Sequence, residues 1–386
     1  MMEHLTQSYI KYYTKKNYQI HENVPLSSLD DPTLFFVNST IAVFKENIKN
    51  NEFILDTAQV QDCFRSNGNV DDPSLSLFFK MIGNVAMIES ITTILNDFIS
   101  FLIEIGQVSL KYIYGIISEN DHDLQALWRS TLLTNNMVLI PDNKSDDYPT
   151  RWAYGKGYEF TGRGLTFVCD NPTIPKCSPK CNIFCNCSKY LAIGNLIIVE
   201  SNLHQNKYID LGCGLERIAS YKYKNDLYLL PEMKNLVEKL INLGFNDISA
   251  KKIINLMRGI FKLIAEKVHP SNKKEGYILK SLIKYLINEI ILLTSKDIDL
   301  INTIYNSIFQ IMKHFDNEIN DNYNIVLLSE ISKSILNMNQ NITSAQKFIR
   351  KNVTWPKEKL QQRITETFGL PPYIVNDIIK IQLDSQ

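Results

Sequence analysis

The segment YIDLGCGLERIASY, residues 208–221, places an acid, two glycines and an arginine in close succession. Arg217 begins an apolar run typical of a helix, just after Gly212 and Gly214. A guanidinium stays charged and binds phosphate oxygens bidentately, so Arg217 is a candidate phosphate ligand. The glycines would let a flat ring or a ligand backbone approach the strand. The alternative interpretations are a structural salt bridge for the arginine and close packing for the glycines.

Two further segments combine polar groups with tight apolar strand sequence. In QVQDCFRSNGNVDDPSLSLFFKMIGN, Arg65 stands on a strand that is followed by a polar loop and a return strand. Such an arrangement can hold a phosphate against a sheet, although a surface salt bridge is the simpler reading for one arginine. The other segment is HENVPLSSLDDPTLFFVNSTIAVFK.

Four of the seven cysteines lie in KCSPKCNIFCNC, at Cys177, Cys181, Cys185 and Cys187, and Cys169 is just upstream. We expect a structural zinc site held by the four clustered thiolates, because the N-terminus resembles no secretory signal and disulfides are rare inside cells. The spacing lacks paired C-x-x-C motifs, so reduced free thiols are the alternative. Isolated Cys63 and Cys213, in apolar surroundings, are expected to be small buried side chains.

Composition limits the class of protein. The 386 residues include 41 Lys plus Arg and 41 Asp plus Glu, and this neutral balance argues against a generic basic nucleic-acid binder. The most apolar segment, ITTILNDFISFLIEIG, is interrupted by Asp97 and Glu104 and has helical apolar spacing, so it predicts a buried amphipathic helix rather than a membrane span. We therefore expect a soluble cytoplasmic protein with no membrane partner, present as a monomer or weak dimer.

The pattern of apolar residues changes near residue 229. Before it, short β-type runs alternate with helices and few clean crossover helices occur, which favours a mixed or antiparallel sheet over a doubly wound one. After it, segments such as AKKIINLMRGIFKLIAEKV carry apolar stripes of helical period. The expected fold is α+β, with one domain at 1–228 and an α-helical domain at 229–386.

In combination and order, these segments resemble class II aminoacyl-tRNA synthetases, specifically the alanyl-tRNA synthetase family. The N-terminal helix with TLFFVNSTIAVFK resembles the first motif, QDCFRSNG with LFFKMIGN the second, and YIDLGCGLERIAS the third. Further on, HPSNKKEGYILKSLIKYL and ITETFGLPPYIV resemble parts of the family's helical tRNA-acceptor domain. The resemblance covers nearly the whole chain and implies an antiparallel sheet with flanking helices, followed by helices, without an editing domain.

The resemblance also implies a reaction in which an amino-acid carboxylate joins the α-phosphate of ATP, with Mg²⁺ on the phosphates and release of pyrophosphate. By position, Asp210 would bind the substrate ammonium, and Gly212 would leave room for a small side chain. Arg65 would bind the α-phosphate and substrate carboxylate, and Arg217 the γ-phosphate. The remaining residues implied at the site are Asn195 and Trp152 for the amino acid, Phe79 and Gly214 for ATP, and Asn272 and Lys280 for tRNA.

Departures from the family's motifs leave two functions open. The family's E-I-W-N reads AIGN here, with Ala192 in place of a carboxylate and Gly194 in place of a bulky wall. In GYILKSLIKYL, Lys280 and Lys284 remain but the usual arginines are absent. One function is an alanine–tRNA ligase without editing. The alternative is a paralogue that passes an activated amino acid to a carrier protein or a small-molecule amine.

Overall fold

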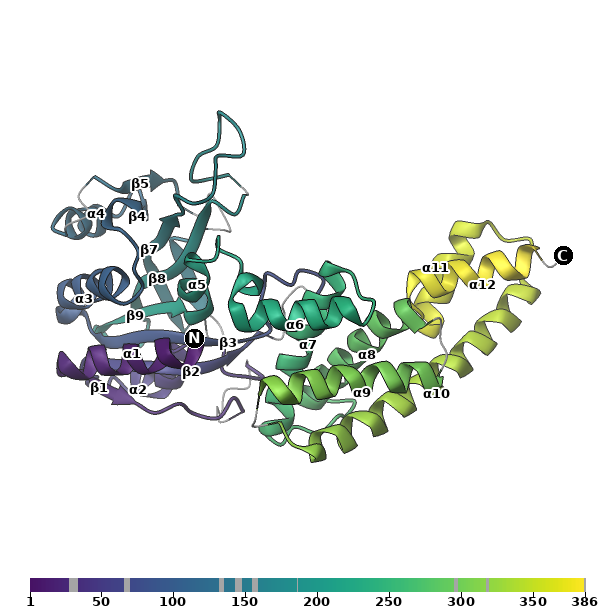
Figure 1. Cartoon of the computed structure of the whole chain (residues 1–386). Coiled ribbons are helices and arrows are strands. Elements are labelled where there is room, and N and C mark those ends of the chain that lie inside the picture. Colours follow the sequence, from purple (N-terminus) through teal and green to yellow (C-terminus); the bar gives the residue numbers. More distant parts are fainter. Residues whose placement is uncertain are drawn as a thin grey trace. The chain divides into compact units, whose positions relative to one another are not determined.

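The computed structural model describes residues 1–27, 34–65, 70–131, 135–142, 148–154, 159–185, 187–294, 298–316 and 319–384. Parts of the segments that resemble the first two family motifs, at 28–33 and 66–69, lie outside the described residues. The chain folds as two compact units, Met1–Val237 and Glu238–Gln386 (Figure 1). The division falls inside a helix, somewhat later than the boundary expected at residue 228.

The first unit is built on a mainly antiparallel sheet. Its order is β1-β2-β3-β9-β8-β7-β4-β5, with β6 paired to β7 at one side. Only β1 with β2 and β4 with β5 run parallel among the described strands. The strands are β1 (Gln19–His21), β2 (Thr57–Phe64), β3 (Phe78–Met87), β4 (Ile113–Ser118), β5 (Met137–Ile140), β6 (Arg151–Tyr154), β7 (Phe160–Asp170), β8 (Tyr190–Ser201) and β9 (Lys207–Gly214).

Aromatic residues fix helices against one face of this sheet. Tyr9 of α1 donates a hydrogen bond to the Gly83 carbonyl of β3 at 2.8 Å, and its ring meets Phe101 of α3 edge-on. Phe98 of α3 contacts Phe167 of β7, as the amphipathic pattern of that segment predicts. The helical elements of this unit are α1 (Met2–Lys15), η1 (Ile41–Phe44), α2 (Lys45–Lys49), η2 (Ile88–Ser90), α3 (Ile91–Glu104), η3 (Leu110–Tyr112), α4 (His122–Arg129), α5 (Leu215–Tyr221) and η4 (Leu227–Leu229).

The segment TLFFVNSTIAVFK was expected to contain a strand and does not form one in its described part. From residue 34 it runs as irregular chain into η1 and α2. Ile41, Phe44 and Ile48 pack with Val85, Ile197, Val199 and Tyr208, on the face of the sheet opposite α1 and α3. Burial of this apolar run against an existing sheet face satisfies it without strand pairing.

The second unit is helical throughout its described residues, and α6 (Pro231–Asn242) runs across the division. Its helices are α7 (Asp247–Ala265), α8 (Lys274–Thr294), α9 (Ile298–Phe315), α10 (Asp321–Lys351), α11 (Lys357–Phe368) and α12 (Pro372–Asp384). The helices α10, α11 and α12 share their own apolar cluster, which includes Ile349, Ile364 and Ile374. The α+β class and the antiparallel character of the sheet are therefore confirmed. None of the described helices is long and apolar enough to span a bilayer.

Candidate active site

The site face is the side of β9 that carries Asp210, Gly212 and Gly214. Side chains alternate along a strand, so these three residues face the same way, away from α1 and α3. At about 3.3 Å per residue, Asp210 and Gly214 are about 13 Å apart along the strand. Arg217 follows one turn into α5. The strand thus places the acid at one end of the face and the arginine at the other.

Asp210 is buried and has no cationic partner among the described residues. The residue is 6% exposed, and its carboxylate accepts a long hydrogen bond from the Thr40 hydroxyl at 3.4 Å. Burial raises the pKa of Asp210 to about 7, against a small opposing effect of the Thr40 hydrogen bond. A buried carboxylate without a counter-ion is costly for the protein alone, so this position suits a ligand that brings a positive charge.

The space beside Asp210 is narrow. A Cβ added at Gly212 would lie 3.1 Å from the Met81 sulfur and 3.8 Å from the Thr40 hydroxyl. One added at Gly83, the partner of Gly212 on β3, would clash with Thr40 and with a backbone carbonyl. The two paired glycines, with Thr40 and Met81 beside them, form the floor of the site face next to Asp210.

Asn195 lies beside Gly212, as the β8–β9 register requires. The Thr166 hydroxyl of β7 donates a hydrogen bond to Asn195 Oδ1 at 2.8 Å. Because this bond occupies the amide oxygen, the Asn195 amino group is oriented as a donor. The same face thus offers a hydrogen-bond donor about one strand spacing from β9.

Arg217 and Arg65 form a cationic end to the site face. The Arg217 guanidinium donates a hydrogen bond to the Ala192 carbonyl of β8. Burial, followed by the positive charge of Arg65, lowers the pKa of Arg217. Neither has an ion pair among the described residues. Two guanidiniums at one end of the site face make that end a candidate anion-binding site.

Phe79 and Gly214 accompany these arginines. The Arg65 guanidinium carbon lies 4.8 Å from the centre of the Phe79 ring, which is otherwise buried. This cation–π contact holds Arg65 over the ring. A Cβ at Gly214 would only touch the Arg217 side chain, at 3.5 Å, so packing in the protein alone does not demand glycine there.

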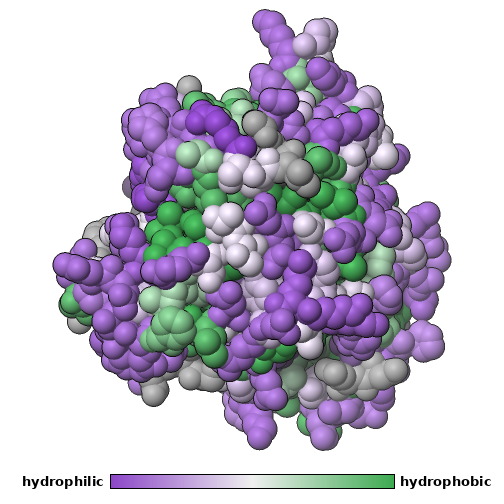
Figure 2. Space-filling view, turned by 90° about the vertical axis from the view of Figure 1, so that its left-hand side faces the viewer, coloured by the Kyte–Doolittle hydropathy of each residue, from purple (hydrophilic) through white to green (hydrophobic). Residues whose placement is uncertain are grey.

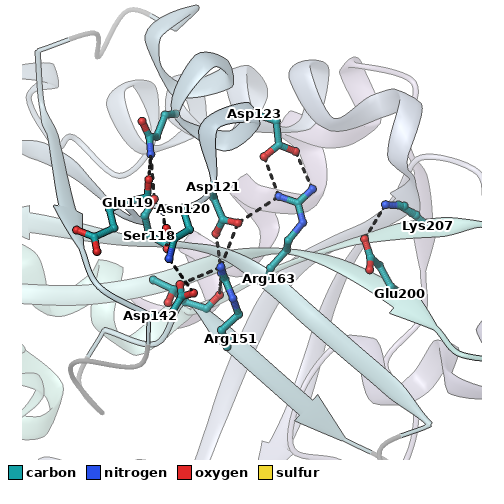
Figure 3. Close-up of polar contacts among 12 residues, drawn as sticks. Ser118, Glu119, Asn120, Asp121, Asp123, Asp142, Arg151, Arg163, Glu200 and Lys207 are labelled. Carbon is teal, nitrogen blue, oxygen red and sulfur yellow. Dashed lines mark hydrogen bonds and ion pairs between the residues drawn. The ribbon is translucent and has the colours of Figure 1, made fainter.

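Trp152 lies on the site face level with Tyr208, two residues before Asp210 along the direction of β9. It lies on β6 opposite Gly162 and packs against the apolar cluster that contains Ile197 and Tyr208. The strand β6 is short and pairs with β7. Ion pairs of Arg151, the residue before Trp152, hold this strand in place. Arg151 binds Asp121 at 2.6 Å and Asp142 at 2.8 Å. In Figure 3, Arg151 and Arg163 both point toward Asp121, and Arg163 also pairs with Asp123.

The four clustered cysteines converge in the connection between β7 and β8. Their sulfur atoms all lie within 4.8 Å of one another, with 3.2 Å between Cys177 and Cys185 and 3.7 Å between Cys181 and Cys187. The connection brings together the four predicted metal ligands, and Cys169 lies apart, buried in β7. Cys63 and Cys213 are fully buried, as expected.

The two residues expected to contact tRNA lie together in the helical unit. Lys280 on α8 donates a hydrogen bond to Asn272 Oδ1 at 2.9 Å, in the turn that precedes the helix. The Ser271 amide closes this turn on the Gly276 carbonyl at 3.0 Å, and a Cβ at Gly276 would collide with Ser271. The predicted site residues thus form three groups, which are the site face and the four-cysteine cluster in the first unit and this pair in the second.

Sequence reasoning missed three contributors to the site face. Thr40 contacts Asp210, Thr166 orients Asn195, and Asp121 anchors the strand of Trp152. Thr40 follows an irregular segment that was taken as a strand, and Thr166 sits within an apolar run. Each acts through a partner distant in the chain, so no local spacing could have identified it.

Comparison with known proteins defines the class to which this fold and site belong. The family model described as tRNA synthetases class II (A) matches residues 4–383. The chain belongs to this family of class II tRNA synthetases.

Particular relatives are curated alanine–tRNA ligases. That of Wigglesworthia glossinidia brevipalpis is 25% identical, over 98% of this chain and 47% of its own length. That of Buchnera aphidicola subsp. Baizongia pistaciae (strain Bp) is 26% identical, over 97% of this chain and 46% of its own length. The chain thus spans about half the length of the curated relatives it matches.

Among solved structures, apo histidyl-tRNA synthetase of S. aureus has a TM-score of 0.33 and 10% identity, covering 57% of this chain and 69% of that chain.

Proposed function

We propose that this chain activates a small amino acid, alanine in the first instance, with ATP and transfers it to tRNA. The observation that carries the proposal is that groups of opposite charge lie at the two ends of the site face. A buried carboxylate, Asp210, stands at one end and two guanidiniums, Arg65 and Arg217, stand at the other, and none of the three has an ion pair within the part of the chain that the structure describes. An amino acid joined to a nucleotide presents an ammonium and phosphates at opposite ends, which is the complementary pattern.

In the proposed reaction, a carboxylate oxygen of the amino acid attacks the α-phosphorus of ATP, and the bond to pyrophosphate breaks. Asp210 binds the ammonium, and the Asn195 amino group donates to the substrate. Arg65 binds the α-phosphate and the carboxylate, and Arg217 binds the γ-phosphate. The chain contributes alignment and neutralisation of charge, and Mg²⁺ accompanies the phosphates of ATP.

The amino-acid selectivity that we propose rests on the narrow floor beside Asp210. A Cβ on Gly212 would already lie 3.1 Å from the Met81 sulfur, and this close packing supports a substrate with a small side chain. Trp152 closes the same face one row away. The alanine–tRNA ligases among the relatives support this choice of substrate.

For transfer, we propose that the turn containing Asn272 and the start of α8 contact the acceptor end of tRNA. Asn272, Lys273 and Lys274 are exposed there, next to Lys280. Lysines neutralise phosphates but lack the rigid fork with which arginine reads a base, so we expect binding that weakens steeply with salt.

At the β7–β8 connection we propose one zinc ion, bound by Cys177, Cys181, Cys185 and Cys187. Four thiolates complete the closed tetrahedral shell of a structural site, and soft ligands of this kind suit zinc.

The test is ATP–pyrophosphate exchange with each of the twenty amino acids, followed by charging of total tRNA. We expect exchange with alanine, and a loss of about a hundredfold in Arg65→Ala and in Arg217→Ala, since each removes a charge-assisted contact worth about 3 kcal/mol. Arg363→Ala, at an exposed position in α11, is the matched control and should retain activity.

Wild-type protein that is silent with every amino acid would refute the catalytic proposal. Exchange without charging of tRNA would instead assign the activated amino acid to another acceptor, a carrier protein or a small-molecule amine.

A further inference from the structure

The connection between β7 and β8, residues 171–189, has an unusual composition for its length. It contains four cysteines and three lysines, and no acidic residue. Its described residues form neither helix nor strand. The connection projects at the top of Figure 1, and the projection at the top of Figure 2 is largely hydrophilic. A segment with so little apolar content needs another source of order.

Metal binding would supply that order. In a tetrahedral zinc–thiolate site with bonds of about 2.3 Å, neighbouring sulfurs lie about 3.8 Å apart. The cysteine sulfurs here already lie within 4.8 Å of one another. Zinc with four thiolates carries a net charge of about −2, and Lys176 and Lys180 provide positive charge in the same connection.

The base of this connection is bound to the helix that carries Arg217. The Asn171 amide donates to the Tyr221 carbonyl at 2.6 Å and to Asn225 Oδ1 at 3.0 Å. In return, the Asn225 amide donates to the Ser188 carbonyl at 2.6 Å. Through these two asparagines, both ends of the connection meet the last residue of α5 and the turn just after it.

A buried lysine closes the same base. Lys189 is 7% exposed, pairs with Asp170 at 2.8 Å and donates to the Asn171 carbonyl at 3.0 Å. The Tyr221 hydroxyl donates to the Asp170 carbonyl at 3.2 Å. These contacts join the two ends of the connection to each other and to α5.

The lever is short. The helix α5 spans only Leu215–Tyr221, so Arg217 lies one turn from the end that is held. Its guanidinium also reaches Ala192 on β8, three residues beyond Lys189. A displacement at the base of the connection would change both the direction of α5 and the strand that receives Arg217.

We infer that the four-cysteine connection is a metal-dependent support for α5, and that Asn171 and Asn225 are positioning residues that orient Arg217 for the γ-phosphate of ATP. The catalytic part of this inference rests on the proposed function, and the metal and structural parts do not. Metal removal or loss of the asparagine bridge should weaken ATP binding more than turnover.

The experiment starts with the full chain purified without chelator. We expect one equivalent of zinc and no iron by elemental analysis, and four reactive thiols after chelation. Hydrogen exchange of the amides at 215–221 should accelerate about tenfold in the chelated protein. Cys181→Ser and Cys185→Ser should lower the zinc content and accelerate the same amides, whereas Cys169→Ala, outside the cluster, should do neither.

Asn171→Ala separates support from metal binding. We expect this variant to keep its zinc, yet to show the accelerated exchange at 215–221 and about a tenfold rise in KM for ATP with kcat within about threefold. Asn182→Ala, inside the connection but not in the bridge, is the matched control and should match wild type. Returning zinc to chelated wild-type protein should restore both the slow exchange at 215–221 and the low KM for ATP. Returning zinc to chelated Asn171→Ala should restore neither.

Two results would overturn the inference. Iron, two disulfides or no metal in the purified protein would disprove the zinc site. Stoichiometric zinc, with unchanged exchange at 215–221 after its removal and unchanged KM in Asn171→Ala, would disprove the support. Absence of pyrophosphate exchange in wild type would refute the proposed function alone, because metal content and hydrogen exchange are read without activity.

Discussion

Two buried aspartates of the first unit have opposite surroundings. Asp121 is 5% exposed and lies between Arg151 and Arg163, at 2.6 and 3.5 Å. Asp210 is 6% exposed and accepts a single long hydrogen bond from a hydroxyl. Equal burial therefore has opposite consequences, because one carboxylate is neutralised by the chain and the other is not.

The difference separates support from recognition. A buried carboxylate with its cations in place stabilises the position of its elements, here the turn before α4 and the strands β6 and β7. A buried carboxylate without a cation costs stability, and it is retained where a ligand supplies the charge. The absence of a cationic partner among the described residues, more than the burial, makes Asp210 our candidate for the functional acid.

The largest effect is expected from Asp210→Asn on activity. The amide keeps the shape but cannot pair with an ammonium, so about 4 kcal/mol of binding should be lost, roughly a thousandfold in kcat/KM for the amino acid. KM for ATP should change little, which initial-rate pyrophosphate exchange at varied ATP would measure. Activity within threefold of wild type would remove Asp210 from the site.

Asp121→Asn should act on stability instead. Removing the carboxylate takes from Arg151 and Arg163 the buried acid that they share and leaves each with its more exposed partner, Asp142 or Asp123. This loss should lower the free energy of unfolding by about 3 kcal/mol. The matched control is Asp123→Asn, whose carboxyl side chain is 61% exposed and should contribute less than about 1 kcal/mol. Urea denaturation of the three proteins gives the values. Equal stability of the two variants would mean that the buried cluster is not the support described here.

The smallest effect is a pH dependence that belongs to Asp210 alone. Its pKa is raised to about 7 in the folded protein, against 3.8 for the ordinary side chain. Between pH 4 and 7 the folded state therefore holds a proton that the unfolded chain has released, and stability falls as the pH rises through this range. Relative to Asp210→Asn, wild type should lose about 2 kcal/mol between pH 5 and pH 8 without ligand. A parallel pH profile for both proteins would contradict the raised pKa.

Helices whose apolar residues recur with a clear helical period could be predicted directly from the sequence. The apolar spacing in ITTILNDFISFLIEIG gave α3, and the stripes after residue 229 gave α6 to α9. The irregular segment before η1 was misread as a strand, because an apolar run that packs on a sheet has the same composition as one that joins it. The helices α10 to α12 were not predicted individually.

The sequence by itself determined the chemistry available to this protein. The order of the segments around Arg65, Asp210 and Arg217 led to the class II family, and the four-cysteine segment indicated a metal site. Such features depend on residues close together in the chain, where type and spacing are visible.

Only the tertiary structure decided which charged groups are satisfied. It placed Thr40 against Asp210, gave Asp121 its two arginines and joined Asn171 to the end of α5. The physical reason is that the free energy of a charge depends on its burial and on partners brought from distant segments, and neither is a property of the local sequence.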